Sequence, residues 1–238
     1  MIKVKLYATA VGLVLLLFAF TAVSAEAGKP RYKYAGEQTS FDKPIVIDNS
    51  TTAFSYYAEL ASGQPDIYQV YAVGGEPAQI SLAAPKSDDL KNFAPSMALI
   101  GPGITTNVPT NTLPVALPKG MGAVVLNYTG DLNNRPVISD PATMTGAWQG
   151  QEYRATYPKA APYYILIWDK QGRGGKYIMT VGSQDDFGLF DLIKFPYTWA
   201  KLNIWFGNWL NLLLAVLIVV AVIFAVVWLV ARRRRRTV

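Results

Sequence analysis

Asp66-Ile-Tyr-Gln-Val-Tyr-Ala-Val73 is followed, beyond the turn residues Gly74 and Gly75, by Pro77-Ala-Gln-Ile-Ser-Leu-Ala83. The second stretch alternates apolar and small polar residues, which is typical of a strand with one buried face. Similar aromatic and β-branched runs recur at Pro44–Asp48, Phe54–Leu60, Pro95–Ile100, Gly122–Asn127, Glu152–Tyr157, Pro162–Trp168 and Gly175–Val181. About nine short strands, with no helix-period segment between them, predict an all-β, antiparallel jelly-roll-like or Ig-like β-sandwich.

The C-terminal end of the chain has a different character. From Leu212 to Ala231 there is no charged or strongly polar side chain, and the run Arg232 to Arg236 follows. As a helix, this segment covers about 30 Å, the thickness of a bilayer's hydrocarbon core. Positive residues are retained on the cytoplasmic side of a membrane, so the sequence predicts a single-pass protein of the cell membrane with its sandwich outside and its C-terminus cytoplasmic.

The N-terminal end has the order of a secretory signal peptide: Lys3 and Lys5, an apolar run from Leu6 to Val23, and small residues up to Ala27. Cleavage could follow Ala25 or Ala27, and the second is preferred. An uncleaved signal anchor, which would give two membrane spans, is the alternative.

The predicted organisation has six parts. They are a signal peptide (1–27), a spacer (28–42), an extracytoplasmic β-sandwich (43–186), an aromatic-rich juxtamembrane stalk (187–208), a transmembrane helix (209–231) and a basic cytoplasmic tail (232–238). In the stalk, Phe187–Phe195 is expected to form a short amphipathic helical turn that ends at Pro196. Aromatic rings and arginines favour the headgroup level of a bilayer. The residues predicted at the membrane interface are Trp199, Trp205, Trp209, Trp228, Arg232, Arg233, Arg234, Arg235 and Arg236.

The net charge of +6 is a property of the two ends. Two lysines lie in the leader and five arginines in the tail, which leaves 15 of the 22 basic residues against 15 acidic residues between Gly28 and Asn208. Nucleic-acid binding needs a basic face on the folded domain. The near-neutral ectodomain therefore argues against a nucleic-acid partner.

The chain contains neither Cys nor His. An exported domain without Cys has no disulfides and depends on its core for stability. The absence of His excludes His-ligated zinc, copper or haem, and also Ser-His-Asp and Cys-His nucleophilic systems. Carboxylate chemistry, Ser-Lys chemistry and calcium binding through oxygen ligands stay open.

Two loops are candidates for calcium, with Asp131, Asn133 and Asp169 as the candidate ligands because a hard cation prefers oxygen. Asx residues are also common in turns that bind no metal, so the prediction is no cofactor, with calcium as the alternative. Asn49-Ser-Thr51 and Asn127-Tyr-Thr129 match the N-glycosylation acceptor, which matters if the host glycosylates.

Other features have structural interpretations as well as functional ones. The acid pairs Asp88-Asp89 and Asp185-Asp186 are expected to be solvated turn carboxylates, since neighbours in a strand point to opposite faces. Half of the tyrosines in the strands should pack in the core. A sugar-stacking platform that includes Trp148, Tyr153 or Tyr157 is the alternative.

The strands Asp66–Gly75, Gln79–Leu82, Tyr163–Asp169 and Gly175–Val181 resemble the bacterial pre-peptidase C-terminal domain. Ala98–Gly103 followed by Leu117–Ala123 also resembles a group of uncharacterised exported prokaryotic membrane-anchored proteins. The first resemblance implies a small jelly-roll-like β-sandwich in an accessory or binding role, and it transfers no catalytic residue. The long segment between Ile100 and Glu152 departs from that family.

Three functional hypotheses follow. The leading one is a non-enzymatic interaction or accessory module at the cell surface, whose partners are the lipid bilayer and a membrane or envelope protein. The second is a carbohydrate-binding surface protein, which would bind a polysaccharide. The third is a carboxylate-dependent hydrolase, which needs two facing acids in a cleft.

Overall fold

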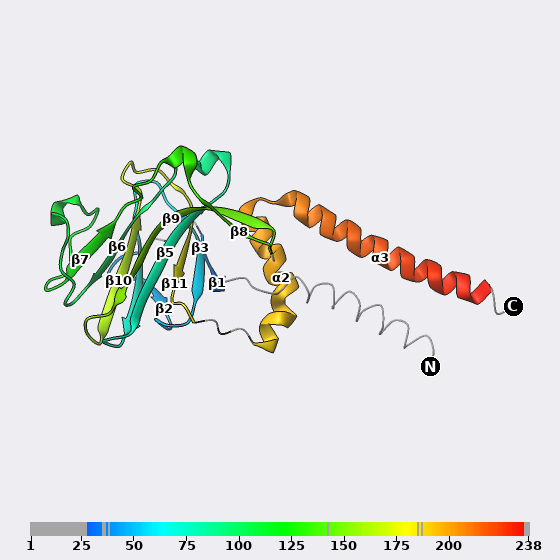
Figure 1. The fold of residues 1–238 in the computed structure, drawn as a ribbon, viewed down its shortest axis with the longest axis horizontal. Helices are drawn as coiled ribbons and strands as arrows, with labels where there is room; N and C mark the ends of the chain where they lie inside the picture. The colour runs from blue at the N-terminus through cyan, green and yellow to red at the C-terminus, as the bar shows by residue number, and fades with distance from the viewer. Residues whose placement is uncertain are drawn as a thin grey trace. The chain divides into compact units, whose positions relative to one another are not determined.

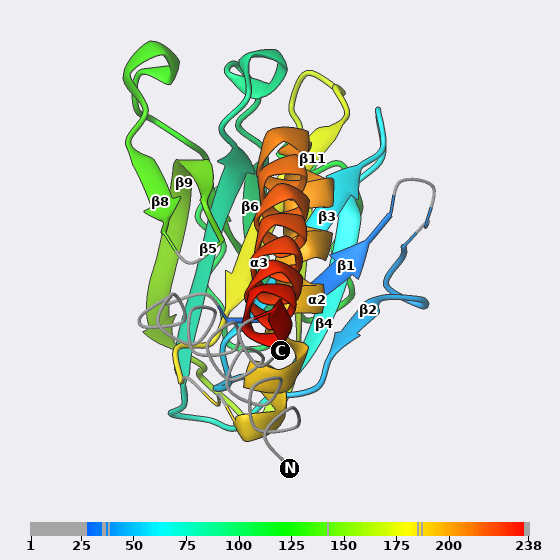
Figure 2. The same cartoon turned by 90° about the vertical axis from the view of Figure 1, so that its right-hand side faces the viewer.

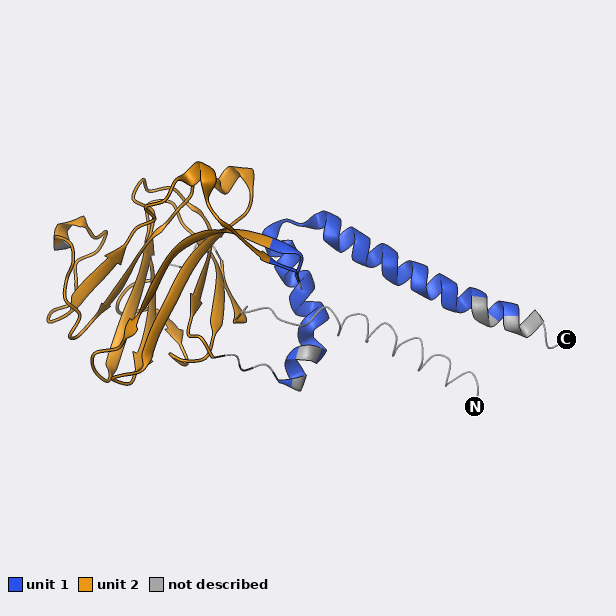
Figure 3. Cartoon of the chain, in the orientation of Figure 1, with its two compact units in different colours: residues 1–25, 140–145, 188–238 blue, residues 26–139, 146–187 orange. Residues whose placement is uncertain are grey.

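A computed structural model describes residues 28–34, 37, 39–141, 143–184, 186 and 188–235. The predicted signal peptide at 1–27 lies outside the described residues. The chain divides into two compact units, which Figure 3 distinguishes by colour. One unit comprises residues 26–139 and 146–187, and the other comprises residues 1–25, 140–145 and 188–238. We call them the sandwich unit and the helical unit.

The sandwich unit is built on two sheets that form two layers (Figure 1). The six-stranded sheet has the order β1 (Lys29–Lys33), β3 (Phe54–Leu60), β11 (Gly175–Val181), β5 (Pro77–Pro85), β9 (Thr145–Thr156) and β8 (Val137–Asp140). Figure 2 shows this order, with β1 beyond β3 at one edge and β8 beyond β9 at the other. The strand β1 pairs with β3 in parallel, whereas β3, β11, β5 and β9 pair antiparallel.

The five-stranded sheet has the order β2 (Ile45–Ile47), β4 (Asp66–Ala72), β10 (Ala161–Trp168), β6 (Ser96–Gly101) and β7 (Gly122–Leu126). Only the β2–β4 pair is parallel among the pairs of this sheet. Because strand side chains alternate between faces, every second residue enters the core between the sheets. The buried residues of that core include Tyr68, Val70 and Ala72 of β4, Tyr163, Ile165 and Ile167 of β10, and Tyr177, Met179 and Val181 of β11.

These sheets confirm the predicted, mainly antiparallel all-β sandwich. Both β3 and β11 have the predicted bounds, because their residue patterns and flanking turn residues are local signals. The expectation of a spacer at 28–42 needs correction, since this segment supplies β1 of the six-stranded sheet. The long segment between Ile100 and Glu152 contains β7, β8 and the first half of β9. Three short 3-10 helices lie between strands: η1 (Asp88–Leu90), η2 (Thr110–Thr112) and η3 (Leu132–Asn134).

The described residues of the helical unit form two long helices. The helix α2 (Leu189–Phe206) continues through Pro196, so the prediction that the helix ends there is wrong. A proline inside a helix removes one N–H group, and the remaining turns and the packed face of α2 maintain the helix beyond it. The helix α3 spans Trp209–Arg235. Among the described residues, its stretch Trp209–Trp228 is the one helical segment long and apolar enough to cross a membrane.

Candidate functional site

The outer face of the five-stranded sheet is half covered. Its buried residues on β4, β6, β7 and β10 form a second hydrophobic cluster with Leu113, and partly buried residues of the segment before β7 pack on it. The residues of this cover are Phe41, Val115, Leu117 and Met121. Apolar residues of the segment before β7, together with Phe41, therefore close part of a sheet face.

The rest of this outer face is open. We define the open face as Val46 of β2, Gln69 and Tyr71 of β4, and Pro162 and Tyr164 of β10. Val46 and Tyr164 both pair with Gln69, and Tyr71 pairs with Pro162, so the five side chains share one side of the sheet. Val46 is 62% exposed and Tyr71 is 64% exposed.

Two contacts hold the polar groups of the open face. The Gln69 amide Nε2 donates to the hydroxyl of Tyr164 at 3.3 Å. The Tyr164 ring packs edge-on against Phe41, with centroids 5.1 Å apart, at the border of the covered half. The open face therefore combines exposed apolar area with a hydrogen-bonded amide and hydroxyl.

A buried ionic network links the two sheets. Lys33 Nζ lies 2.9 Å from Asp66 Oδ1, and Tyr177 donates to Asp66 Oδ2 at 2.6 Å. The hydroxyls of Tyr177 and Tyr68 are 2.7 Å apart, and Lys33 also donates to the carbonyl of Glu59. Burial raises the pKa of Asp66, and the hydrogen bonds from Tyr177 and Lys33 oppose that shift. Because all four side chains of the network are enclosed, its role is structural.

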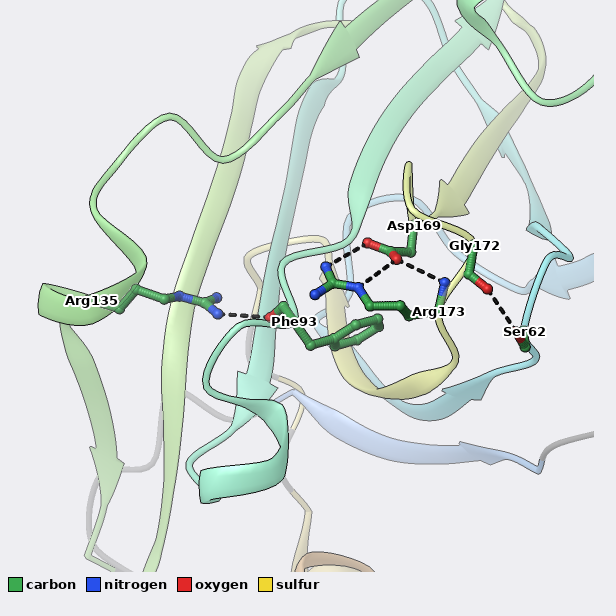
Figure 4. Close-up of polar contacts among 6 residues, drawn as sticks. All are labelled: Ser62, Phe93, Arg135, Asp169, Gly172 and Arg173. Atoms are coloured by element: carbon green, nitrogen blue, oxygen red, sulfur yellow. Dashed lines mark hydrogen bonds and ion pairs between the residues drawn. The ribbon is translucent and has the colours of Figure 1, made fainter.

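The loops at one end of the sandwich are held by polar contacts (Figure 4). In the turn between β10 and β11, the Arg173 guanidinium donates to both carboxylate oxygens of Asp169, at 2.9 and 3.0 Å. Ser62 Oγ donates to the carbonyl of Gly172 at 2.7 Å and ties the β3–β4 turn to this one. The turn connects β10 of the five-stranded sheet to β11 of the six-stranded sheet, so it crosses from one layer to the other.

Arg135 is the second anchor at this end (Figure 4). Its buried guanidinium donates to the carbonyls of Phe93, Trp148 and Gln149, and its Cζ lies 4.9 Å from the centroid of the Tyr128 ring. Burial lowers the pKa of Arg135. These contacts join the loop after β5, the entry to β8 and the middle of β9.

The candidate calcium ligands take part in turn contacts and an ion pair. Asp131 and Asn133 are exposed, and Asp131 Oδ1 accepts from the Asn133 backbone N–H at 2.9 Å, which caps η3. Burial alone would raise the pKa of Asp169, but the hydrogen bonds from Arg173 outweigh it and lower that pKa. The described residues contain no cluster of three or more Asp or Glu that could hold a metal ion. The carboxylates therefore serve turns and an ion pair.

The two glycosylation acceptors lie in different surroundings. Asn49 is exposed, and its Oδ1 accepts from the backbone N–H groups of Thr51 and Thr52 and from the Thr51 hydroxyl. Asn127 is half-buried, and its Oδ1 accepts from Ser96 Oγ at 2.8 Å. Modification of either residue stays a prediction.

The residues predicted at the membrane interface have different environments. Trp209 and Trp228 are exposed on α3, and the Arg232 guanidinium lies 5.2 Å from the centroid of the Trp228 ring. Trp199 is half-buried on α2, and Trp205 is only 8% exposed and contacts the Phe206 ring edge-on. Trp205 is therefore covered by other residues of the chain. The arginines Arg233, Arg234 and Arg235 lie in the last turn of α3, and Arg236 lies outside the described residues.

The rings of the candidate sugar platform are not displayed together. Tyr157 is buried against Tyr163, and Tyr153 packs against the core. Lys86 Nζ lies 5.6 Å from the centroid of the half-buried Trp148 ring. Of the acid pairs, Asp88 and Asp89 are exposed on η1, as expected of turn carboxylates. Asp186 pairs with Lys29, and Asp185 lies outside the described residues.

Comparisons with known proteins give structural likenesses. No family model and no curated protein sequence matches the chain. A similar solved structure is PliG, a periplasmic lysozyme inhibitor of g-type lysozyme from Aeromonas hydrophila, with 10% identity, 65% of this chain and 99% of that chain covered, and a TM-score of 0.34. CorA, a surface-associated copper-binding protein of Methylomicrobium album BG8, has 13% identity, coverage of 62% and 99%, and a TM-score of 0.29.

The pre-peptidase C-terminal domain of a Bacillus anthracis collagenase is also similar, with 11% identity, coverage of 57% and 91%, and a TM-score of 0.27. This structure is of the domain type that the sequence resembles, as expected.

Sequence reasoning missed three features of these sites. Lys33 lies in a polar stretch that reads as solvated, and only its register with β3 reveals its burial. Arg135 lies among loop residues, and the carbonyls that accept its hydrogen bonds belong to residues distant in sequence, which only the fold brings close. The strand alternation places Tyr68 and Tyr71 on opposite faces, but it cannot tell which face is covered.

Proposed function

We propose that this chain is a membrane-anchored, extracytoplasmic β-sandwich that acts as a non-enzymatic interaction or accessory module at the cell surface. The observation that carries this proposal is the open face. It presents Tyr71 and Val46 to solvent beside a hydrogen-bonded Gln69–Tyr164 pair on a rigid sheet. Tyrosine is enriched among the residues that dominate binding energy at protein interfaces.

The state of the carboxylates supports a non-enzymatic role. Asp66 is enclosed between the sheets, and Asp169 is committed to Arg173. Asp88 and Asp89 are exposed on a single 3-10 turn. A carboxylate-dependent hydrolase needs two acids that face each other across a substrate, and these side chains do not take that arrangement.

The helix α3 supports anchoring in a bilayer. Its stretch Trp209–Trp228 is apolar, and arginines follow at its C-terminal end. With these arginines on the cytoplasmic side, the sandwich lies outside the cell. Because this anchor would hold the chain at the membrane, the partner that the open face contacts is a membrane or envelope protein.

Comparison of two tyrosine variants tests the proposal. The full chain is extracted from native membranes in mild detergent, and the proteins that co-purify are identified. Tyr71→Ala should reduce recovery of one specific partner at least tenfold, because interface residues of this kind contribute 2 kcal/mol or more. Tyr34 is also exposed but lies outside the open face, so Tyr34→Ala is the matched control and should keep the partner.

Two results would contradict the proposal. Equal recovery of every associated protein by both variants would remove the open face as the binding surface. Hydrolase activity of the purified chain that is abolished by one carboxylate substitution would instead establish an enzyme.

A further inference from the structure

The helix α2 carries an exposed apolar stripe. Phe190, Ile193, Tyr197 and Ile204 are 76%, 75%, 69% and 50% exposed, respectively. Their spacing of three, seven and fourteen residues from the first places them on one face of a helix with 3.6 residues per turn. We call these four residues the α2 stripe.

The sides of α2 away from the stripe are already packed. Leu202 and Trp205 are buried, and Asn203 is fully enclosed. Asn203 Nδ2 donates to the carbonyl of Thr143 at 3.0 Å and to the carbonyl of Trp199 at 3.0 Å. The α2 stripe is therefore the remaining apolar face of a helix whose other face is held within the helical unit.

The orientation of α2 is fixed to that of α3. Gly207 ends α2 in the left-handed conformation, with φ of 76°, and its N–H donates to the carbonyl of Ile204. Asn211 Nδ2, in the first turn of α3, donates to Asn203 Oδ1 at 2.8 Å and to the carbonyl of Met144 at 3.3 Å. This junction places the α2 stripe directly before the apolar surface of α3, which begins at Trp209.

Basic residues accompany the α2 stripe. Lys194 is exposed one residue after Ile193, and Lys201 follows seven residues later on the same side of the helix. The acidic residue Asp191 accepts from the N–H of Gly188 and is used at the N-terminus of the helix. An apolar face bordered by lysines is the pattern of a helix that lies in a membrane surface.

We propose that α2 is an interfacial helix, with the α2 stripe inserted among the lipid acyl chains and Lys194 at the lipid phosphates. The inference rests on the proposed function, because it requires α3 to be in the bilayer. Lipid is the occupant that continuity with α3 favours, since only Gly207 and Asn208 separate the two apolar surfaces. Such helices sit about 5–10 Å into the boundary between headgroups and acyl chains.

The inference revises the expected interface. Of the α2 residues, the ones that enter lipid are Phe190, Ile193, Tyr197 and Ile204. Trp205, which the sequence suggests as an interfacial ring, faces protein instead. The α2 helix then fixes the membrane-proximal end of the chain to the bilayer plane as well as to α3.

The chain contains no Cys, so single-Cys variants can be spin-labelled without removing native thiols. The full chain is reconstituted in nanodiscs that contain anionic phosphatidylglycerol. Collision rates with oxygen, which concentrates in lipid, and with a water-soluble nickel complex are measured for each label. Ile193→Cys and Tyr197→Cys report on the α2 stripe. Ile218→Cys, in the middle of α3, is the lipid reference, and Lys170→Cys, in an exposed turn of the sandwich, is the water reference.

The proposal predicts that the ratio of oxygen to nickel collisions at positions 193 and 197 is several-fold higher than at position 170 and approaches that at position 218. A ratio at position 193 equal to that at position 170, with position 218 in lipid, would overturn the inference and leave the anchor intact. Shielding of position 193 from both reagents would also overturn it, because protein would then cover the stripe. A water-like ratio at position 218 would contradict the membrane anchoring itself.

Discussion

Lys33→Met should destabilise the sandwich strongly, because it removes the cation from a closed network. Lys33 and Asp66 are 2% and 3% exposed, and their charged atoms are 2.9 Å apart. Methionine retains the length of the side chain but leaves the Asp66 carboxylate with Tyr177 alone. Removal of one partner of a buried ion pair costs about 3–5 kcal/mol of unfolding free energy.

The loss should depend on pH, with a defined sign. The folded-state pKa of Asp66 is raised above its ordinary value of 3.8, so the folded state binds a proton more tightly than the unfolded state. The stabilisation that this tighter proton binding provides is complete at pH values below the ordinary pKa. It is lost as the pH rises through the raised folded-state pKa. Without Lys33, the pKa of Asp66 rises further, so the gap between variant and wild type widens as the pH increases from 5 to 8.

Urea unfolding of the full chain in mild detergent, followed by near-ultraviolet circular dichroism, measures the loss at both pH values. We expect about 3–5 kcal/mol at pH 8 and a smaller loss at pH 5, because the raised pKa of Asp66 favours the neutral carboxyl as the pH falls. The double variant Lys33→Met with Asp66→Leu removes both charges and should recover most of the loss. A loss below about 1 kcal/mol at pH 8, or an equal loss at both pH values, would refute this account of the network.

Three further perturbations test the loops and the packing. Arg135→Met leaves carbonyls unpaired at one end of the sandwich and should lower the unfolding free energy by about 1–3 kcal/mol, measured by the same titration. Gly101→Ala should lower the unfolding free energy by a similar amount, because the added Cβ would overlap the buried Tyr163 ring. In the control Gly146→Ala, the added Cβ meets only ordinary contacts, and the loss should be less than about 1 kcal/mol. A chelator should leave the thermal midpoint of unfolding unchanged. Asp169→Asn should lower that midpoint, because the Asp169 carboxylate accepts hydrogen bonds from the Arg173 guanidinium in the same turn. A lower midpoint with the chelator alone would show that calcium is bound.

Local signals made much of the sandwich predictable. The bounds of β3 and β11 follow from aromatic and β-branched runs between turn residues. The strand β1 could not be predicted in this way, because it is short, basic and polar. It forms because β3 provides a parallel partner and because Lys33 forms a buried ion pair with Asp66 of the other sheet.

The candidate surfaces were less predictable because they depend on what covers each face. Alternation in β4 and β10 indicates that half of the tyrosines are outside the core, yet Tyr164 is partly covered by Phe41 whereas Tyr71 is open. Likewise, Pro196 suggests a helix end, but the buried Asn203 and its contacts extend the helix beyond it. Long-range packing decides both outcomes.

Photo-crosslinking in intact cells shows whether the open face contacts a partner protein. A benzoylphenylalanine in place of Val46 is compared with one in place of Tyr34, which is exposed elsewhere on the chain. Our account predicts that position 46 crosslinks to one membrane or envelope protein and that position 34 does not. Equal crosslinking from both positions, or none from position 46, would contradict it.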